Sequence, residues 1–237
     1  MNSINFQKLV SLLITHPIFQ NNSNHSQAPI ELQLAIFLRR IGSKEDIFGL
    51  CSRFGIAEGT VYLYCKRVMI AIFSLKKTLV KWPTGEAKQN IHEGFKNIGE
   101  MEDVIGAIDG SHIVLANAPL RQPETYWNRK KRYSIQLQGI VDYRVVENAF
   151  GRSKNRFIAL KELNVRVIST VVKITECAII LHNFLELNND NVEELYENDD
   201  DEDGDDDSDN DEDINQNEIV MKREGERKKR AINESNY

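Results

Sequence analysis

The chain has 237 residues, which suits one or two small domains, and its formal net charge is −6. That acidity is local, because 16 of the 36 acidic residues and none of the 30 basic ones fall between positions 190 and 213. Residues 1–189 hold 16 acids and 24 bases, a net charge of +8, so the average charge does not exclude a nucleic-acid binder. The three cysteines lack CxxC spacing, which excludes a disulfide scaffold and a cysteine-rich zinc site.

The N-terminal part of the chain divides into an arm and a helical segment. Residues 1–28 hold a short apolar stretch and then a polar run, and we expect a mobile N-terminal arm. Residues 29–82 have helical spacing of apolar residues. Pro29 suits a first helical turn because it needs no amide donor, and Gly42 suits a helix end. This pattern predicts a first helix between those two residues.

Residues 47–66 match a helix-turn-helix template. Gly55 falls at the turn, where a positive φ is favoured, and a second helix is expected to run to about Phe73. In the DNA-binding interpretation this helix faces the major groove, and the candidate DNA contacts are Arg53, Tyr62, Lys66 and Arg67. The alternative is an ordinary three-helix packing unit. Contacts to the DNA backbone fit these residues better than base reading does.

The next segment, residues 104–142, is predicted to form two strands joined by a long turn. The first strand is apolar but carries Asp109 in its middle, followed by Gly110 and Ser111. A buried carboxylate is costly unless it is paired, protonated or bound to a metal, so a divalent cation is one interpretation. The other is a hairpin turn, for which Asp-Gly is a strong signal. His112 could approach such a metal, although a structural role is favoured.

Four consecutive basic residues precede the second strand, and they adjoin Tyr126, Trp127 and Tyr133. A basic run beside aromatic rings is typical of a nucleic-acid backbone contact, although a solvated charged turn has the same composition. The run consists of Arg129, Lys130, Lys131 and Arg132. The strand that follows alternates apolar and polar residues and ends at Asp142.

Residues 145–187 are predicted to form two long helices. Glu147 lies in the first turn of the earlier helix, where the helix dipole favours an anion. The later helix, 165–187, is apolar nearly all round, which predicts an exposed apolar patch and self-association through it. Its charged residues interrupt the apolar run, so we expect no membrane span. His182 is interpreted as a core histidine rather than a metal ligand.

The remaining segment, residues 188–237, has the composition of a disordered acidic and then basic tail. Its acidic block either keeps the protein soluble or competes with DNA for the positively charged residues 1–189. The basic run at 222–230 is a candidate nuclear import signal, which predicts a nuclear protein.

Taken together, these motifs resemble the Harbinger-type transposases and their domesticated nucleases, members of the DDE superfamily of endonucleases. The resemblance rests on the helix-turn-helix, on "IGAIDGSHI" around Asp109 and on "YWNRKKRYSIQLQGIVD". It also rests on "VVENAFGRSKNRF", which contains Glu147, and on "CAIILHNFLE", which contains His182. The matching pieces occur in family order over about residues 30–187.

The resemblance implies a ribonuclease-H-like core that cleaves and joins DNA strands with two metal ions, Mg²⁺ or Mn²⁺. In this reading Asp109 and Glu147 are the catalytic, metal-binding carboxylates. It further implies a separate Myb-like DNA-binding partner. This chain departs from the family between Arg144 and Val145, where about a hundred residues carrying two strands and the second catalytic Asp are missing, through either an internal deletion or a mis-predicted splice.

The sequence therefore predicts an α+β protein that is mostly α. It comprises a helix-turn-helix domain over 29–82 and a truncated ribonuclease-H-like DDE domain over 104–187, which keeps two strands and two long helices. Asp142 is an additional candidate metal ligand that could replace the missing Asp. We expect a catalytically dead nuclease of this family, and the alternative is a non-enzymatic DNA- or partner-binding module.

Overall fold

The computed structural model describes residues 1–21, 24–99, 102–143 and 149–190. Within these ranges the chain is mostly helical and has one small three-stranded mixed sheet, so the predicted class, α+β with a helical majority, is confirmed. Three predictions concern positions outside the described residues: Glu147, the junction at Arg144 and the tail beyond residue 190.

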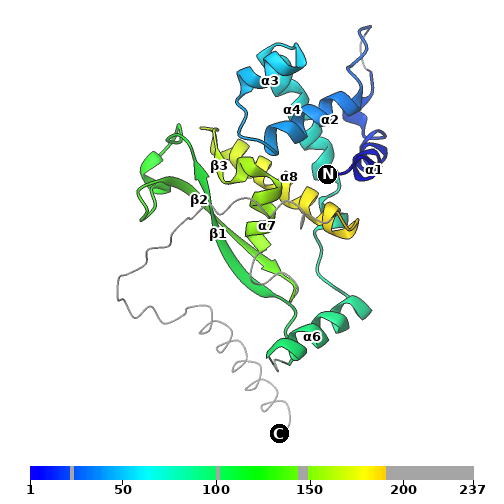
Figure 1. Ribbon diagram of the computed structural model, residues 1–237, viewed down its shortest axis with the longest axis vertical. Coiled ribbons are helices and arrows are strands. Elements are labelled where there is room, and N and C mark those ends of the chain that lie inside the picture. The colour runs from blue at the N-terminus through cyan, green and yellow to red at the C-terminus, as the bar shows by residue number, and fades with distance from the viewer. Residues whose placement is uncertain (22–23, 100–101, 144–148, 191–237) are drawn as a thin grey trace. The chain divides into compact units, whose positions relative to one another are not determined.

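The described elements follow one another as Figure 1 shows. The α-helices are α1 (Ser3–Leu13), α2 (Ile30–Ile41), α3 (Ile47–Phe54), α4 (Glu58–Ser74), α5 (Lys76–Leu79), α6 (Gly85–Gly99), α7 (Ala149–Arg156) and α8 (Ile168–Leu187). The strands are β1 (Ala107–Leu115), β2 (Tyr133–Val141) and β3 (Glu162–Leu163). Short 3₁₀ helices are η1 (Pro17–Phe19), η2 (Pro123–Tyr126) and η3 (Ile158–Leu160).

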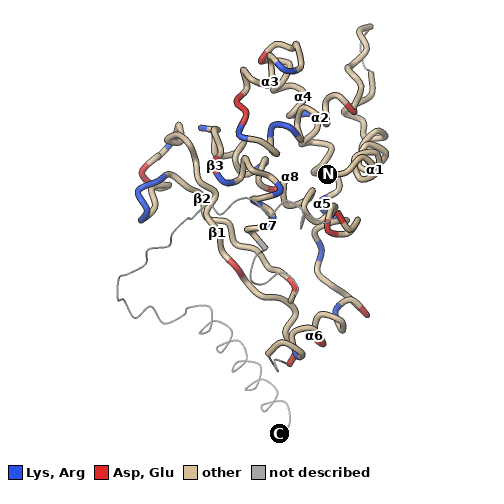
Figure 2. The backbone as a smooth tube through the Cα atoms, viewed as in Figure 1, with Lys and Arg blue, Asp and Glu red and all other residues tan. Residues whose placement is uncertain are grey.

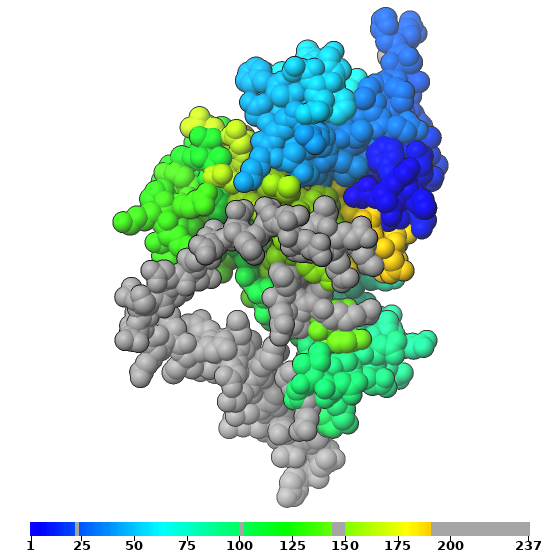
Figure 3. Space-filling view, viewed as in Figure 1, coloured from blue at the N-terminus to red at the C-terminus, as the bar shows by residue number. Residues whose placement is uncertain are grey.

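Helices α2, α3 and α4 pack against one another as three neighbouring helices. The side chain of Asp46 caps α3 by accepting a hydrogen bond from the Gly49 amide at 2.7 Å. Gly55 ends α3 with a φ of 63°, which is the positive φ that the sequence predicts at this turn. Leu50 and Val61 are fully buried on the facing sides of α3 and α4. Figure 3 shows the N-terminal helices as one continuous packed mass.

The N-terminal segment contains a helix where the sequence suggested a mobile arm. The side chain of Asn2 accepts a hydrogen bond from the Asn5 amide at 2.8 Å and so caps α1. Leu9 and Leu13, four residues apart, lie on one helix face and are fully buried. The apolar spacing in this stretch was therefore the signal of a packed helix.

The sheet has the strand order β2-β1-β3, with β1 and β2 antiparallel and β1 and β3 parallel. In β1 the odd-numbered side chains face the core, because Ala107, Ile113 and Leu115 are buried while the alternate residues are more exposed. The two predicted strands are thus present, and the two-residue strand β3 is an addition. Helix α6, also an addition, contacts the end of β2 through Phe95 and Tyr143, whose rings meet edge to face at 6.1 Å.

Helix α8 lies in the core and does not present the exposed apolar patch that its sequence predicted. Buried residues from α8 and from α2, α4 and β1 share one hydrophobic cluster, so the predicted domains at 29–82 and 104–187 have a common core. The thiol of Cys177 on α8 donates to the Met69 carbonyl of α4 at 3.8 Å. Among the exposed large apolar residues of α8 are Val172 and Leu187.

By length and composition α8 is the one described helix that is apolar enough to cross a membrane, although the charged residues within it predict no membrane span. Half of its apolar stretch is buried inside the protein, as in a core helix.

Candidate nucleic-acid interface

The four basic residues of the predicted contact lie at the end of the β1–β2 ribbon, in a segment that we call the ribbon tip, residues 127–132. A tight turn shapes the tip: the Lys131 amide donates to the Asn128 carbonyl at 3.0 Å, and Lys131 has a φ of 57°. Arg129, Lys130 and Lys131 are all exposed. Figure 2 shows Lys and Arg gathered at this end of the ribbon. The geometry therefore presents cations to solvent on a fixed turn.

The fourth basic residue of the tip, Arg132, forms an ion pair. Arg132 Nη2 donates to Glu162 Oε1 at 2.9 Å. Glu162 is in place because β3 pairs with the end of β1, at Val114. Both side chains remain about half exposed, so solvent screens the pair and its contribution to stability is small. The charge of Arg132 is thus partly neutralised. The segment after β3 adds another exposed cation, Arg166, whose carbonyl accepts a hydrogen bond from the Leu120 amide.

Helix α4 carries three of the predicted DNA contacts, namely Tyr62, Lys66 and Arg67. Tyr62 is 47% exposed, and the guanidinium of Arg40 lies 5.5 Å from its ring centroid. Lys66 is exposed one helical turn further on. Arg67 is half-buried and lines an open groove beside Tyr64. The outer side of α4 is therefore a mixed aromatic and basic surface, with less positive charge than the ribbon tip.

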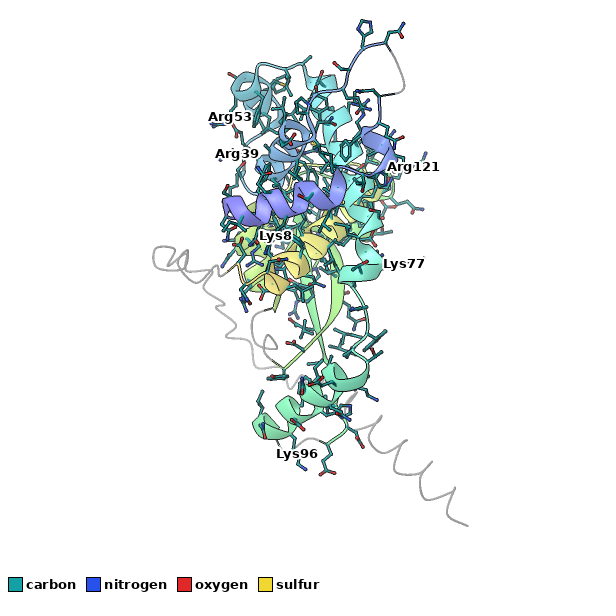
Figure 4. All side chains as sticks on the ribbon, turned by 90° about the vertical axis from the view of Figure 1, so that its right-hand side faces the viewer. Lys8, Arg39, Arg53, Lys77, Lys96 and Arg121 are labelled. Atoms are coloured by element: carbon teal, nitrogen blue, oxygen red, sulfur yellow. The ribbon has the colours of Figure 1, made fainter. Side chains whose placement is uncertain are left out.

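Arg53 is a second predicted contact that forms an ion pair with an acid. Glu45 accepts from Arg39 Nε at 2.8 Å and from Arg53 Nε at 3.0 Å. Figure 4 shows Arg39 and Arg53 close together on the same side of the molecule. The hydrogen bond from Arg39, followed by that from Arg53, lowers the pKa of Glu45 against the opposing effect of burial. Glu45 thus stays ionised and offsets one of the two positive charges.

Asp109 faces the core side of the ribbon, opposite Gly139. Its Oδ1 accepts a hydrogen bond from the next amide, that of Gly110, at 2.7 Å. A Cβ added at Gly139 would lie 2.9 Å from Cζ of Phe150, so the ring from α7 lies directly on the strand at this point. The Asp-Gly pair sits within the ladder rather than at a turn, so the hairpin-turn interpretation of this dipeptide is wrong.

The register keeps the other candidate metal ligands away from Asp109. Asp142 follows the last paired residue of β2, three positions beyond Gly139, which corresponds to about 10 Å along the strand. Strand β2 ends at Val141, so Asp142 lies just beyond the paired ladder. His112 lies on the side of the ribbon opposite to Asp109, with Nδ1 3.0 Å from the Ser134 hydroxyl.

The described residues do not assemble the metal-ligand set that the resemblance implies. They contain no group of three His, Cys, Asp or Glu side chains that could hold a metal ion. Two-metal chemistry needs several carboxylates around ions about 3.5–4 Å apart. Of the three candidate ligands, Asp109 and Asp142 are separated and Glu147 lies outside the described residues.

A buried polar cluster joins α7 to the end of α8 and explains His182. Arg156 Nη1 donates to His182 Nδ1 at 3.0 Å and to Glu186 Oε1 at 3.0 Å, and the Arg156 side chain is only 5% exposed. Burial, followed by the Arg156 charge, lowers the pKa of His182 to about 4. His182 is therefore a neutral, hydrogen-bonded core histidine, and the prediction of a structural role is confirmed.

Sequence reasoning missed three residues that shape this surface. Glu45 and Glu162 neutralise predicted DNA contacts, and Asn128 forms the turn of the ribbon tip. Neither acid adjoins its partner in sequence, so no local pattern could have found the pairs. Asn128 does carry a signal, because asparagine is favoured at the start of tight turns.

Comparisons with known proteins give two similarities to plant proteins. It is 28% identical over 114 residues to the Arabidopsis thaliana protein named Antagonist of Like Heterochromatin Protein 1. It is also 28% identical over 124 residues to an Arabidopsis thaliana protein named ALP1-like. The matches span 48% and 52% of this chain but only 29% and 30% of the relatives, so the chain spans about a third or less of their length.

No protein-family model matches the chain, and no solved structure gives a significant match. The two similarities support a Harbinger-related origin.

Proposed function

We propose that this chain is a DNA-binding protein derived from a Harbinger-type transposase and that it binds DNA without cleaving it. The observation that carries the proposal is the ribbon tip, where Arg129, Lys130 and Lys131 are exposed on a hydrogen-bonded turn. Cations held on a rigid element contact successive phosphates at a lower entropic cost than flexible ones. The similarity to transposase-derived proteins makes DNA the expected polyanion.

The α3–α4 pair supplies a second contact in this proposal. Two helices joined at a left-handed glycine, with a third helix packed against them, would serve as a DNA-binding helix-turn-helix in this proposal. Lys66 and Arg67 would contact phosphates, and Tyr62 would add an aromatic surface. Arg53 contributes less, because Glu45 already pairs with it.

We infer the absence of cleavage from the arrangement of the candidate metal ligands. In the related transposases the metal ions activate water and stabilise the leaving oxygen of the cleaved strand. Here the sequence lacks the family segment with the second catalytic Asp, and Asp142 does not lie beside Asp109 to replace it. Asp109 instead accepts from its neighbouring amide on a strand covered by Phe150.

The proposal also extends to the setting in which the protein acts. The basic run at 222–230 would direct it to the nucleus, and a Myb-like partner would supply the sequence specificity that a phosphate-contacting surface lacks. A fluorescent fusion of this chain should therefore be nuclear, and co-expression with such a partner should recruit it to DNA. A fusion that stays cytoplasmic and unbound would contradict this extension.

Binding and cleavage can be tested together with the purified full chain. Supercoiled plasmid and a 30-base-pair duplex are incubated with the protein in Mg²⁺ or Mn²⁺. We expect retarded migration of both DNAs and no nicked plasmid. Failure to bind either DNA at physiological salt would contradict the binding proposal. Metal-dependent nicking that Asp109→Ala abolishes would instead show that this copy is an active nuclease.

A further inference from the structure

The ribbon tip is held by a connected set of hydrogen bonds centred on Asn128. The Asn128 amide donates to the Arg132 carbonyl at 2.9 Å, and Asn128 Oδ1 accepts from the Arg132 amide at 3.0 Å. Asn128 Nδ2 donates to the Ser134 hydroxyl at 2.9 Å, which ties the turn to β2. The backbone and the asparagine side chain together fix the segment that directly follows Trp127. The tip is therefore pre-organised before any ligand arrives.

Trp127 is held at this fixed turn and is nevertheless half exposed. It pairs with Tyr133 as an isolated antiparallel bridge, and the two rings meet edge to face with centroids 4.8 Å apart. The Trp127 amide donates to the Glu124 carbonyl of η2 at 3.4 Å. The residue nevertheless leaves 52% of its surface exposed. The result is a large, positioned ring that is available to a ligand.

The charges around Trp127 indicate what that ligand is. Arg129, Lys130 and Lys131 follow Trp127 after Asn128 and are exposed. The chain after β3 runs along the start of the β1–β2 connection, because the Ala116 amide donates to the Leu163 carbonyl and Arg166 Nε donates to the Ala118 carbonyl. An aromatic ring flanked by cations complements a nucleotide, whose base offers a flat π-face and whose phosphates offer negative charge.

We propose that Trp127 stacks on an unpaired DNA base while the cations of the ribbon tip hold the flanking phosphates. This inference rests on the proposed DNA binding and names the form of DNA that the tip prefers. In an intact duplex both faces of every internal base are already stacked, and opening a step costs free energy. A bulge, flap or single strand offers an unstacked base without that cost. We therefore expect the tip to favour DNA with an unpaired base over intact duplex.

The chain offers a matched control, since it has two tryptophans and the other, Trp82, is 58% exposed in the linker between α5 and α6. In the Trp82→Phe variant the native Trp127 is the sole tryptophan, so its fluorescence reports on stacking without disturbing the tip. In Trp127→Phe only Trp82 emits. Each variant is titrated with three DNAs of equal length: intact duplex, the same duplex with one bulged base, and single strand.

We expect the emission of Trp127 to be quenched by the bulged and single-stranded DNAs and much less by the intact duplex, with Trp82 unchanged throughout. In anisotropy titrations Trp127→Ala should weaken binding to the bulged DNA by about ten-fold, the size expected for the loss of one stacked base. Trp82→Ala should leave that affinity unchanged. Thermal melts of both alanine variants check that the fold is kept.

Two results would overturn the inference while leaving DNA binding intact. One is binding to all three DNAs with no quenching of Trp127, which would make the tip a phosphate contact alone. The other is equal quenching by intact and bulged duplex, which would make Trp127 a general duplex contact. Failure of the wild-type chain to bind any of the DNAs would contradict the proposed function and the inference with it.

Discussion

Arg156 Nη1 lies 3.0 Å from Nδ1 of His182 and donates a hydrogen bond to it. Because a guanidinium can only donate, Nδ1 must keep its lone pair, and the proton of the neutral imidazole sits on Nε2. That nitrogen lies 3.9 Å from Glu186 Oε1, one helical turn along α8. Burial disfavours the protonated imidazole most, and the adjacent Arg156 charge adds to this, so the pKa of His182 is lowered although Glu186 opposes the shift.

The first prediction is a pH dependence of stability that comes from His182. Its pKa is about 4 in the folded chain and 6.5 ordinarily, so the unfolded chain binds more protons between these values. The free energy of unfolding should therefore fall as the pH is lowered from about 6.5 to 4, by about 3 kcal/mol at most. Urea titrations of the wild type across this range measure the effect.

A variant of His182 separates this source from other titrating groups. His182→Gln removes the titration and should flatten the dependence between pH 6.5 and 4, whereas His112→Gln, on the exposed side of the sheet, should keep it. Identical pH profiles for wild type and His182→Gln would contradict the assignment.

The second prediction concerns the two arginines that contact Glu186. Arg156 is 5% exposed and satisfies three acceptors, whereas Arg152 is 26% exposed and makes longer contacts of 3.3 and 3.4 Å. Arg156→Met should lower the free energy of unfolding by about 2 kcal/mol, because it leaves buried acceptors unsatisfied. Arg152→Met should cost about 0.5 kcal/mol. Chemical denaturation measures both, and equal losses would be evidence against a special role of Arg156.

The helical part of the fold could be predicted because its signals are local. Pro29, Gly42 and Gly55 mark helix ends within a few residues of the apolar spacing that defines each helix, and the structure places ends beside all three. Strand β3 has two residues and exists only because it pairs with β1, so its own sequence carries no signal. Helix α6 is mostly polar, and Phe95 is its one buried large side chain, which gives weak periodicity.

The burial of α8 could not be predicted from the sequence. Its apolar residues are visible in the sequence, but the surfaces that cover them come from α4 and α5, about a hundred residues earlier. The sequence therefore predicted apolar surface without predicting its burial. The same holds for the cationic surface. The basic run at the ribbon tip could be predicted from the sequence, but the ion pairs of Arg53 and Arg132 form only when the chain folds.

The third prediction tests the turn between α3 and α4. Gly55 has a φ of 63°, so Gly55→Ala should destabilise the chain by about 1 kcal/mol through backbone strain, although a Cβ would have open space there. Gly59 lies in the first turn of α4, also with open space around it. Gly59→Ala should therefore stabilise the chain by about 0.5 kcal/mol. Thermal melts compare the two, and the same sign for both substitutions would argue against the left-handed turn.

The fourth prediction concerns the masking of positive charge by Glu45. Glu45→Gln removes the acid that pairs with Arg39 and Arg53, so it should raise the affinity for duplex DNA about two- to five-fold at low salt. Glu31→Gln, on the exposed first turn of α2, changes the net charge equally and should have a smaller effect. Anisotropy titrations measure both. An equal gain for the two variants would assign the effect to net charge alone.

The ribbon tip is proposed as the principal phosphate contact, and the salt dependence of DNA binding tests this role most directly. The triple variant Arg129→Gln, Lys130→Gln, Lys131→Gln is compared with Lys81→Gln, Lys88→Gln, Lys173→Gln, which removes the same charge from exposed positions elsewhere. The tip variant should lower the slope of log affinity against log salt by about two to three, since each lost phosphate contact contributes about 0.9. The control should change it by less than one. Equal slopes for the two variants would contradict the account.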